Sequence, residues 1–216
     1  MKKIVIILVL IICLSCKKDL SVDKTAVLPF YNSEEFTPEW ISENDPEYTN
    51  IHTVAPFAFL NQNGDQVTNK DFEGKIYVAD FFFTTCPSIC PILAKNMGSI
   101  QEIYKDDSEV MLLSHSVMPW VDSVEKIKHY ASQKKAMNNK WHLITGDRDE
   151  IYDLARNSYF ADEDYKRTKD ESEFIHSENL ILIDQKGRIR GVYNGTLSIE
   201  TQRLVKHIEK LKMEVG

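Results

Sequence analysis

The residues of this chain best suited to chemistry are two cysteines, Cys86 and Cys90, each followed by a proline in the order Cys-Pro-Ser-Ile-Cys-Pro. Their spacing is one residue wider than that of the C-x-x-C redox motif. A separation of four residues on one helical turn would bring both sulfur atoms to one side, where they could chelate one metal ion or close a disulfide. Both outcomes are open at this point. A pair of inert buried cysteines is the alternative, and the flanking prolines argue against it.

The elements that must position these thiols are a buried strand and a helix. Residues 76–83 are mostly β-branched or aromatic with Asp80 as their one charge, which predicts a strand buried on both faces. Pro91 fits the first turn of a helix, with Cys90 as the N-cap. Apolar residues at spacings of three and four predict its buried stripe: Ile92, Leu93, Met97, Ile100 and Tyr104. The thiols would then lie at the carboxyl end of a strand, where the positive helix end lowers the pKa of a thiol.

The N-terminus predicts a lipoprotein signal peptide over residues 1–15. Two lysines precede the apolar residues 4–14, a run too short to span a bilayer, which takes roughly 20 residues. Leu14-Ser15-Cys16 resembles a lipobox, with Cys16 as the lipidated residue, whereas Cys13 follows the larger Ile12 and fits less well. An uncleaved signal anchor would also place the rest of the chain outside the cytoplasm. We expect an exported protein, lipid-anchored to a bacterial membrane and facing the periplasm.

Composition narrows the possible partners. Without residues 1–15 the chain carries 24 Lys and Arg against 33 Asp and Glu, a net charge of −9. This acidic balance argues against nucleic acid and gives no basic patch for anionic lipid, so membrane contact should come from the lipid anchor. The mature chain contains only Cys16, Cys86 and Cys90. Two thiols left in an exported protein favour a working site over a structural staple.

The rest of the chain predicts a tether and one domain. Residues 16–50 are polar without a sustained period, and their aromatic residues suggest that they pack in places: Phe30, Tyr31, Phe36 and Trp40. Residues 51–216 are long enough for a single domain with a full core.

Strands and helices alternate within this domain. Apolar runs predict strands at residues 55–60, 109–117 and 141–145 and a hairpin at 179–193, while helices would begin at Asp122 or Ser123, at 146–149 and at Ser198. The last helix should face inward with Ile199, Leu204, Val205, Ile208 and Leu211. The acidic residues 161–173 lack periodicity and predict a surface loop. This order predicts an α/β, thioredoxin-like fold: a central mixed β-sheet flanked by helices, with a C-terminal β-hairpin and helix.

One histidine stands out as a candidate third ligand. His176 precedes the hairpin, a region that in a thioredoxin-like layout lies against the corner where the cysteines are. Two thiolates and one imidazole suit copper, and zinc would also accept them. A single histidine is more often structural, and we keep that interpretation for the others considered: His52, His129, His142 and His207.

Three segments together resemble the SCO/SenC family of cytochrome c oxidase assembly proteins: residues 82–91, 174–177 and 182–188. The resemblance covers most of residues 25–213, including Trp40 in Phe-Thr-Pro-Glu-Trp and residues 141–147. It implies a thioredoxin-like fold, one copper ion on Cys86, Cys90 and His176, and delivery of copper or electrons to the dinuclear copper site of an oxidase subunit. That subunit, and other periplasmic copper or thiol proteins, would be the partners.

The chain departs from the family pattern beside this site. Ser116-Val117-Met118-Pro119 stands where the family usually shows Ser-Val-Asp-Pro, while the later acid is kept as Asp122. The acidic group beside the metal loop is therefore expected to be absent, and His115 replaces an aliphatic residue. A neutral thioether in place of a carboxylate predicts a bias toward Cu(I); Met118 as core filler is the simpler alternative.

Two functions from different classes follow. A metallochaperone, which is not an enzyme, would bind copper reversibly and pass it on by ligand exchange. A thiol–disulfide oxidoreductase would instead cycle Cys86 and Cys90 between dithiol and disulfide, reducing the cysteines of the oxidase subunit or sensing redox state. His176 discriminates between them, because a copper carrier needs a third ligand and an oxidoreductase does not. A peroxidase is a weaker interpretation, since no arginine partner is evident.

Overall fold

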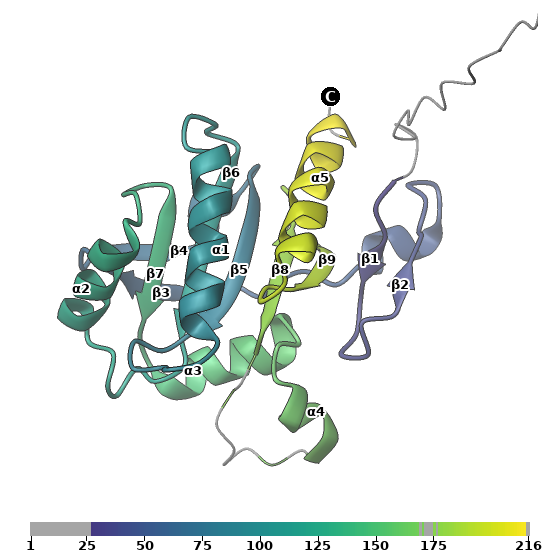
Figure 1. The fold of residues 1–216 in the computed structure, drawn as a ribbon. Coiled ribbons are helices and arrows are strands. Elements are labelled where there is room, and N and C mark those ends of the chain that lie inside the picture. Colours follow the sequence, from purple (N-terminus) through teal and green to yellow (C-terminus); the bar gives the residue numbers. More distant parts are fainter. Residues whose placement is uncertain (1–26, 169, 171–174, 176, 215–216) are drawn as a thin grey trace, which may run out of the picture.

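A computed structural model describes residues 27–168, 170, 175 and 177–214 of the chain. In these residues a seven-stranded mixed sheet lies at the centre, in the order β4-β3-β7-β6-β5-β8-β9, and a two-stranded sheet β1-β2 lies beside it (Figure 1). The strands are β1 Phe30–Tyr31, β2 Pro38–Glu39, β3 Ala58–Asn61, β4 Gln66–Thr68, β5 Ile76–Phe82, β6 Val110–Ser116, β7 Trp141–Thr145, β8 Asn179–Ile183 and β9 Ile189–Asn194. The predicted central mixed sheet and C-terminal hairpin are confirmed.

The helices cover both faces of the sheet. They are α1 Cys90–Ile103, α2 Val124–Lys134, α3 Arg148–Asp153 with a π-helical continuation Leu154–Ser158, α4 Glu163–Thr168 and α5 Ser198–Glu214, and 3₁₀ turns occur at Pro46–Asn50 and Asn69–Phe72. β5, β6 and β7 are parallel because α1 and α2 form the crossovers between them, and β8 returns antiparallel to β5. The arrangement is thioredoxin-like, as predicted. Within the described residues no helix is long and apolar enough to cross a bilayer.

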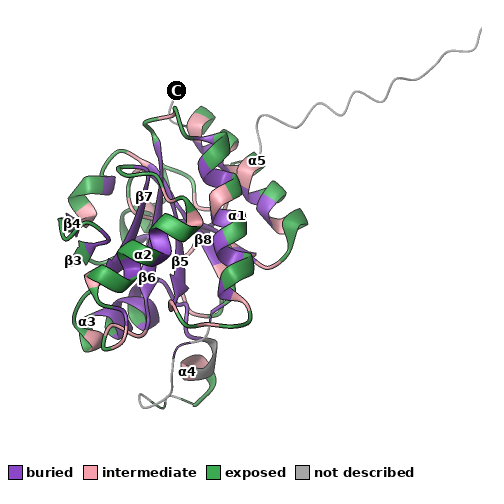
Figure 2. Cartoon of the chain, turned by 60° about the vertical axis from the view of Figure 1, so that its left-hand side comes forward, coloured by how far each residue is buried: buried purple, intermediate pink, exposed green. Residues whose placement is uncertain are grey.

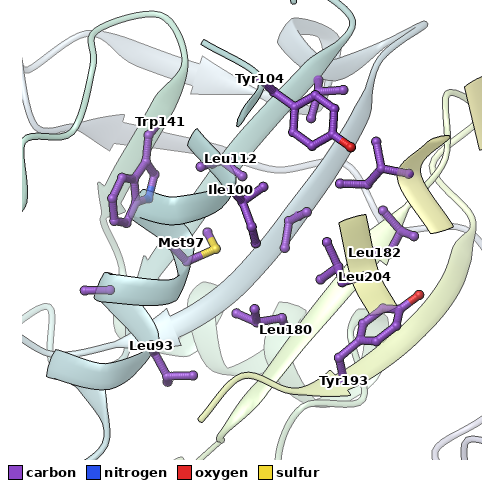
Figure 3. Packing of buried hydrophobic residues seen from close by; sticks show 14 of the residues in the cluster. Leu93, Met97, Ile100, Tyr104, Leu112, Trp141, Leu180, Leu182, Tyr193 and Leu204 are labelled. Atoms are coloured by element: carbon purple, nitrogen blue, oxygen red, sulfur yellow. The ribbon is translucent and has the colours of Figure 1, made fainter. Parts of the chain in front are cut away.

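The central strand β5 is buried along its whole length, so its side chains divide between two cores. Ile76, Val78 and Phe82 face α1, α2 and α5, whereas Tyr77, Ala79 and Phe81 face the α3 side. Figure 2 shows the strands buried between helices whose outer faces are exposed. In Figure 3, Leu93, Met97 and Ile100 of α1 lie in the first core with Leu112 and Leu180. Burial of this strand places its carboxyl end, where the cysteines follow, on a rigid scaffold.

Three local predictions are wrong. Ile92 and Ile199 are 44% and 65% exposed, because each lies in the first turn of its helix, beyond the edge of the packed stripe. The predicted loop 161–173 instead starts inside the protein: Ala161 and Asp162 are buried, and α4 follows at once. The physical reason is a buried ion pair, since the Asp162 carboxylate accepts from Arg156 Nε at 2.8 Å and from the backbone N–H of Tyr165 at 3.0 Å.

The turn before α5 is held against α1. Asn96 Nδ2 donates to the carbonyl of Gly195 at 2.6 Å, and the backbone there approaches so closely that a Cβ on Gly195 would lie 2.5 Å from Leu93 and 2.6 Å from Leu180. A real side chain at this position must therefore displace core atoms in the first turn of α1, three residues beyond Cys90. Gly98, farther along α1, has no such neighbour within 4 Å.

We predict opposite effects on stability for two alanine substitutions. Gly195→Ala should lower the free energy of unfolding by about 1–3 kcal/mol, because the added methyl overpacks the core. The matched control Gly98→Ala should raise it by about 0.5–1 kcal/mol, since it only removes the poor helix propensity of glycine. Urea unfolding of the reduced protein measures both, and equal effects of the two substitutions would contradict the close packing at Gly195.

Candidate metal centre

The two cysteines lie where β5 turns into α1. Cys86 is in the turn, with its backbone N–H donating to the carbonyl of Phe83 at 3.3 Å, and it is partly exposed. Cys90 is buried and is the first residue of α1, with Ile89 as the N-cap, so the prediction of Cys90 as N-cap is wrong by one residue. The pair does not share one helical turn, as the spacing suggested, but the two thiols still interact, and the interaction lowers the pKa of Cys86.

The two thiols differ in acidity. Partial burial raises the pKa of Cys86, but hydrogen bonds from the Cys90 thiol and from backbone groups at Cys90, Ser88 and Ile89 outweigh it, so the net pKa lies below the ordinary value. Burial first, and then the interaction with Cys86, raise the pKa of the Cys90 thiol to about 12. The backbone groups at the start of α1 therefore contribute to a lowered pKa at Cys86, whereas the pKa of Cys90 stays raised. Cys86 is the first to become a thiolate, which is the form that attacks disulfides and binds metals.

A buried carboxylate fixes the loop that carries Cys86. Asp122 is fully buried and accepts from Thr84 N at 3.1 Å, from Thr84 Oγ1 at 2.5 Å and from Ser116 Oγ at 2.6 Å. Ser123, not Asp122, caps α2 by accepting from the backbone N–H of Lys126 at 3.4 Å. Asp122, the acid of the motif that this chain keeps, therefore lies beside the loop, because it binds the residue two positions before Cys86. Position 118, where the family pattern has a second acid, holds a methionine.

A second buried carboxylate lies under the site. Asp80 of β5 accepts from Ser114 Oγ, and Ser114 Oγ in turn accepts from Trp141 Nε1 at 2.8 Å. Burial raises the pKa of Asp80 to about 7, and the Ser114 hydrogen bond offsets part of that rise. Its charge contributes to the raised pKa of Cys90. No role for Asp80 was predicted from the sequence, although a single charged residue inside a buried strand indicates a functional or hydrogen-bonded group.

The other proposed neighbours, Met118 and His115, occupy different surroundings. Met118 is half-buried just past the end of β6, and Val117 beside it donates to the carbonyl of Phe82 at 2.9 Å, which puts Met118 at the same end of the sheet as the cysteine loop. His115 is fully buried on the opposite face, with its ring 4.9 Å from that of Phe81. Burial lowers the pKa of His115 to about 3, so the ring is neutral and lies in the second core rather than beside the thiols.

His176 and Cys16, the predicted third ligand and lipidation site, lie outside the described residues. Among the residues that are described, no group of three His, Cys, Asp or Glu side chains could hold a metal ion. The neighbours Ile175 and Ser177 are buried, and β8 starts at Asn179. Because β8 runs antiparallel to β5, this start lies at the carboxyl end of β5, the end that carries the cysteines.

The remaining histidines considered have neighbours that fit structural roles. His52 lies 2.8 Å from the carbonyl of Ser158, His129 lies 2.9 Å from Gln133, His142 lies 3.4 Å from Asn61, and His207 lies 2.7 Å from the Tyr193 hydroxyl. Burial lowers the pKa of His142 and of His207, the latter to about 4, so both rings are neutral near pH 7.

We predict that iodoacetamide modifies Cys86 much faster than Cys90 at neutral pH, because Cys86 is more exposed and more acidic. The rate at Cys86 should level off at a lower pH than for an ordinary cysteine, while the rate at Cys90 should still rise at high pH. Peptide mass spectrometry measures both. Cys90→Ala should shift the Cys86 profile to higher pH, since it removes a hydrogen bond to the thiolate; faster modification of Cys90 in the parent protein would contradict the assignment.

Comparison with known proteins places this geometry in a family. The SCO1/SenC family model matches residues 45–212. The chain is 32% identical over 146 residues to the SCO1 protein homolog of Bacillus subtilis, covering 67% of this chain and 75% of the relative. The crystal structure of a SCO1/SenC family lipoprotein from Bacillus anthracis superposes with a TM-score of 0.65 at 28% identity, covering 74% of this chain and 95% of that one.

Two further structures are informative about the site. BsSco, described as having a disulfide switch and as a member of the Sco family of cytochrome c oxidase assembly proteins, matches with a TM-score of 0.63 at 28% identity, over 74% of this chain and 94% of that one. ScoI of Bradyrhizobium japonicum with copper bound matches with a TM-score of 0.58 at 26% identity, over 74% and 99%. With the family model spanning most of its length, this chain belongs to the SCO1/SenC family.

Proposed function

We propose that this protein is a copper metallochaperone that assists assembly of the copper site of cytochrome c oxidase. The observation that carries the proposal is the pair of free thiols at the turn from β5 into α1, one partly exposed with a lowered pKa and one buried. Related chains support it, since ScoI of Bradyrhizobium japonicum binds copper and BsSco belongs to a family of oxidase assembly proteins. Copper is the cargo in this function, so the site must both hold the ion and release it.

The residues of the site fit such a cargo. Thiolates are soft ligands that suit copper, and an imidazole at His176 would complete a three-ligand set. Cys86 ionises readily, whereas the Cys90 thiol is protonated near pH 7 and would lose its proton as the metal binds. Cys86 is partly exposed to solvent, so a partner thiolate can reach its sulfur. The buried Cys90 would be the last ligand from which the copper ion dissociates.

The redox state of the pair would control loading. Exported compartments are oxidising, and we expect Cys86 and Cys90 to form a reversible disulfide in the metal-free protein. A disulfide cannot ligate copper as two thiolates do, so reduction must precede binding. The same pair could reduce a partner's cysteines, but copper carriage is the function favoured here because it also accounts for His176.

The same proposal includes the location of the chain. Residues 1–15 would be removed as a signal peptide, Cys16 would carry the lipid, residues 16–50 would form a tether and residues 51–216 the copper-binding domain. The described part of this tether, residues 27–50, contacts the domain, with Leu28 and Phe30 buried. The lipid would hold the protein on a bacterial membrane with the domain in the periplasm, where the copper-site subunit and other copper or thiol proteins are within reach.

We predict one copper ion per chain, bound by Cys86, Cys90 and His176. Replacing any of these residues by Ala should lower copper affinity by orders of magnitude, because each removes a ligand from a three-ligand set. Titration of the reduced protein against a copper chelator measures this. His129→Ala on the exposed face of α2 is the matched control and should bind like the parent; if His176→Ala also does, the third ligand is assigned to the wrong residue.

We predict that Met118 biases the site toward Cu(I). Met118→Asp should raise the affinity for Cu(II) relative to Cu(I) and lower the reduction potential, because a carboxylate stabilises the more highly charged ion. Met118→Asn has nearly the same size without the charge and should produce much less of this change. Paired titrations with the two valences test the idea, and an unchanged ratio in Met118→Asp, with only stability altered, would leave Met118 as packing.

A further inference from the structure

A pocket of about 890 Å³ lies away from the cysteines. Its walls come from the N-terminal segment 27–48, the turn between β8 and β9, and the last turns of α5. Three of its apolar wall residues are strongly exposed: Val27 at 53%, Trp40 at 68% and Met213 at 51%. The indole of Trp40 is oriented by its hydrogen bond to the carbonyl of Val27 at 3.2 Å.

The floor of the pocket is rigid and charge-balanced. Arg190 is 2% exposed and pairs with Asp184 at 3.2 Å and with Glu214 at 2.8 Å, while it also donates to the carbonyls of Leu28 and Pro29. These bonds join the N-terminal segment, β9 and the end of α5. The floor therefore needs no ligand to neutralise it, and the chemistry available to a ligand is that of the rim.

The rim is amphipathic. Lys186 and Lys210 line the pocket beside the exposed Trp40 and Met213, and neither ammonium group forms a salt bridge with a described residue. Lys186 Nζ lies 5.7 Å from the centre of the Tyr48 ring, which also lines the pocket. A flat aromatic ring, a thioether and ammonium groups around one opening match the layer of a bilayer where phosphate groups meet the first acyl carbons.

The pocket is at the end of the molecule opposite to the thiols. α1 and α5 run side by side in the same direction: Asn96, in the first half of α1, bonds to Gly195 just before α5, and Asp107, just past α1, pairs with Lys212 in the last turn of α5. The 14 residues of α1 correspond to roughly 20 Å along the axis. Figure 1 shows the C-terminal end of α5 at one end of the fold, far from the start of α1.

The chain itself brings this end to a membrane. Val27, on the rim, follows the proposed lipid attachment site Cys16 by 11 positions. Such a stretch spans at most about 40 Å when fully extended, so an anchored chain cannot carry the pocket farther than that from the bilayer surface. The inference below rests on the lipid attachment contained in the proposed function.

We propose that this pocket is the membrane-docking surface of the anchored protein and takes up a phospholipid headgroup. The phosphate would lie between Lys186 and Lys210, and Trp40 and Met213 would enter the layer of the upper acyl carbons. Docked in this way, the cysteine loop points away from the bilayer, toward the water-exposed domain of a membrane-bound partner.

The test uses the full lipidated chain on vesicles of phosphatidylethanolamine and phosphatidylglycerol whose acyl chains are brominated near the headgroup. Bromine quenches only tryptophans that contact the lipid. We expect quenching in the parent and in Trp120→Phe, and loss of most of it in Trp40→Phe, because Trp120 is also exposed but follows β6 at the cysteine end. Quenching that survives Trp40→Phe, or that disappears in Trp120→Phe, would overturn the proposed orientation.

A charge reversal tests the headgroup contact. Lys210→Glu should reduce Trp40 quenching several-fold, whereas Lys206→Glu, on the same helix but outside the pocket, should leave it unchanged; equal effects would overturn the phosphate site. Sedimentation with the vesicles distinguishes lipid anchoring of the chain from docking of the pocket on the bilayer. A chain that sediments without Trp40 quenching is anchored but not docked, which overturns the docking alone, and one that does not sediment overturns the anchoring as well.

Discussion

The carboxylate of Asp122 lies fully buried beside the ends of the parallel strands β5 and β6 and accepts hydrogen bonds from both sides: from Thr84 after β5 and from Ser116 at the end of β6. A buried carboxylate is tolerated only when its oxygens are satisfied, so this charge forces the two strand ends to stay together. The loop that starts at Thr84 has no freedom to drift, and Cys86 follows two residues later. The position of the reactive thiol thus depends on a group that never touches it.

Burial then makes the two thiols unequal. Cys90 is enclosed with Phe82 and the first turns of α1 and lies above Asp80, so the negative form of its sulfur is disfavoured. Cys86 is partly exposed and receives hydrogen bonds from Cys90 and from backbone N–H groups. Two thiols of equal acidity would have no defined order of ionisation. An unequal pair has a defined order of ionisation and attack, which is what both ligand exchange and disulfide exchange require.

Much of this was predictable, because the patterns that fix the scaffold are strong. The apolar run of β5, the proline-started helix and the hairpin before α5 each gave an element of the correct type, and the order of elements gave the thioredoxin-like fold. Two of the failures share a cause. β6 is buried on both faces, so its pattern does not say which side chains face α1, and His115 turned out to face away. In the same way, no local pattern shows that Arg156 and Asp162 pair inside the protein, which is what turned an expected loop into a buried corner.

The N-terminal segment is held by hydrogen bonds and charge pairs between distant residues, which no local sequence pattern predicts. Its strands β1 and β2 have two residues each and no period, yet Arg190 fixes the segment through Leu28, Pro29 and Glu214, which are up to 186 positions apart in the chain. Removing one partner of this buried pair should destabilise the protein more than removing one partner of an exposed pair, because it would leave a buried guanidinium unpaired. The consequence of this pairing is mechanical: the N-terminal segment is held rigidly at Leu28 and Pro29, where it meets β9 and the end of α5. Because α1 and α5 run in parallel from the cysteine end toward that point, the junction and the thiols lie at opposite ends of the same packed helices, so a rigid junction fixes how the N-terminal segment lies relative to the thiols and a flexible one would not.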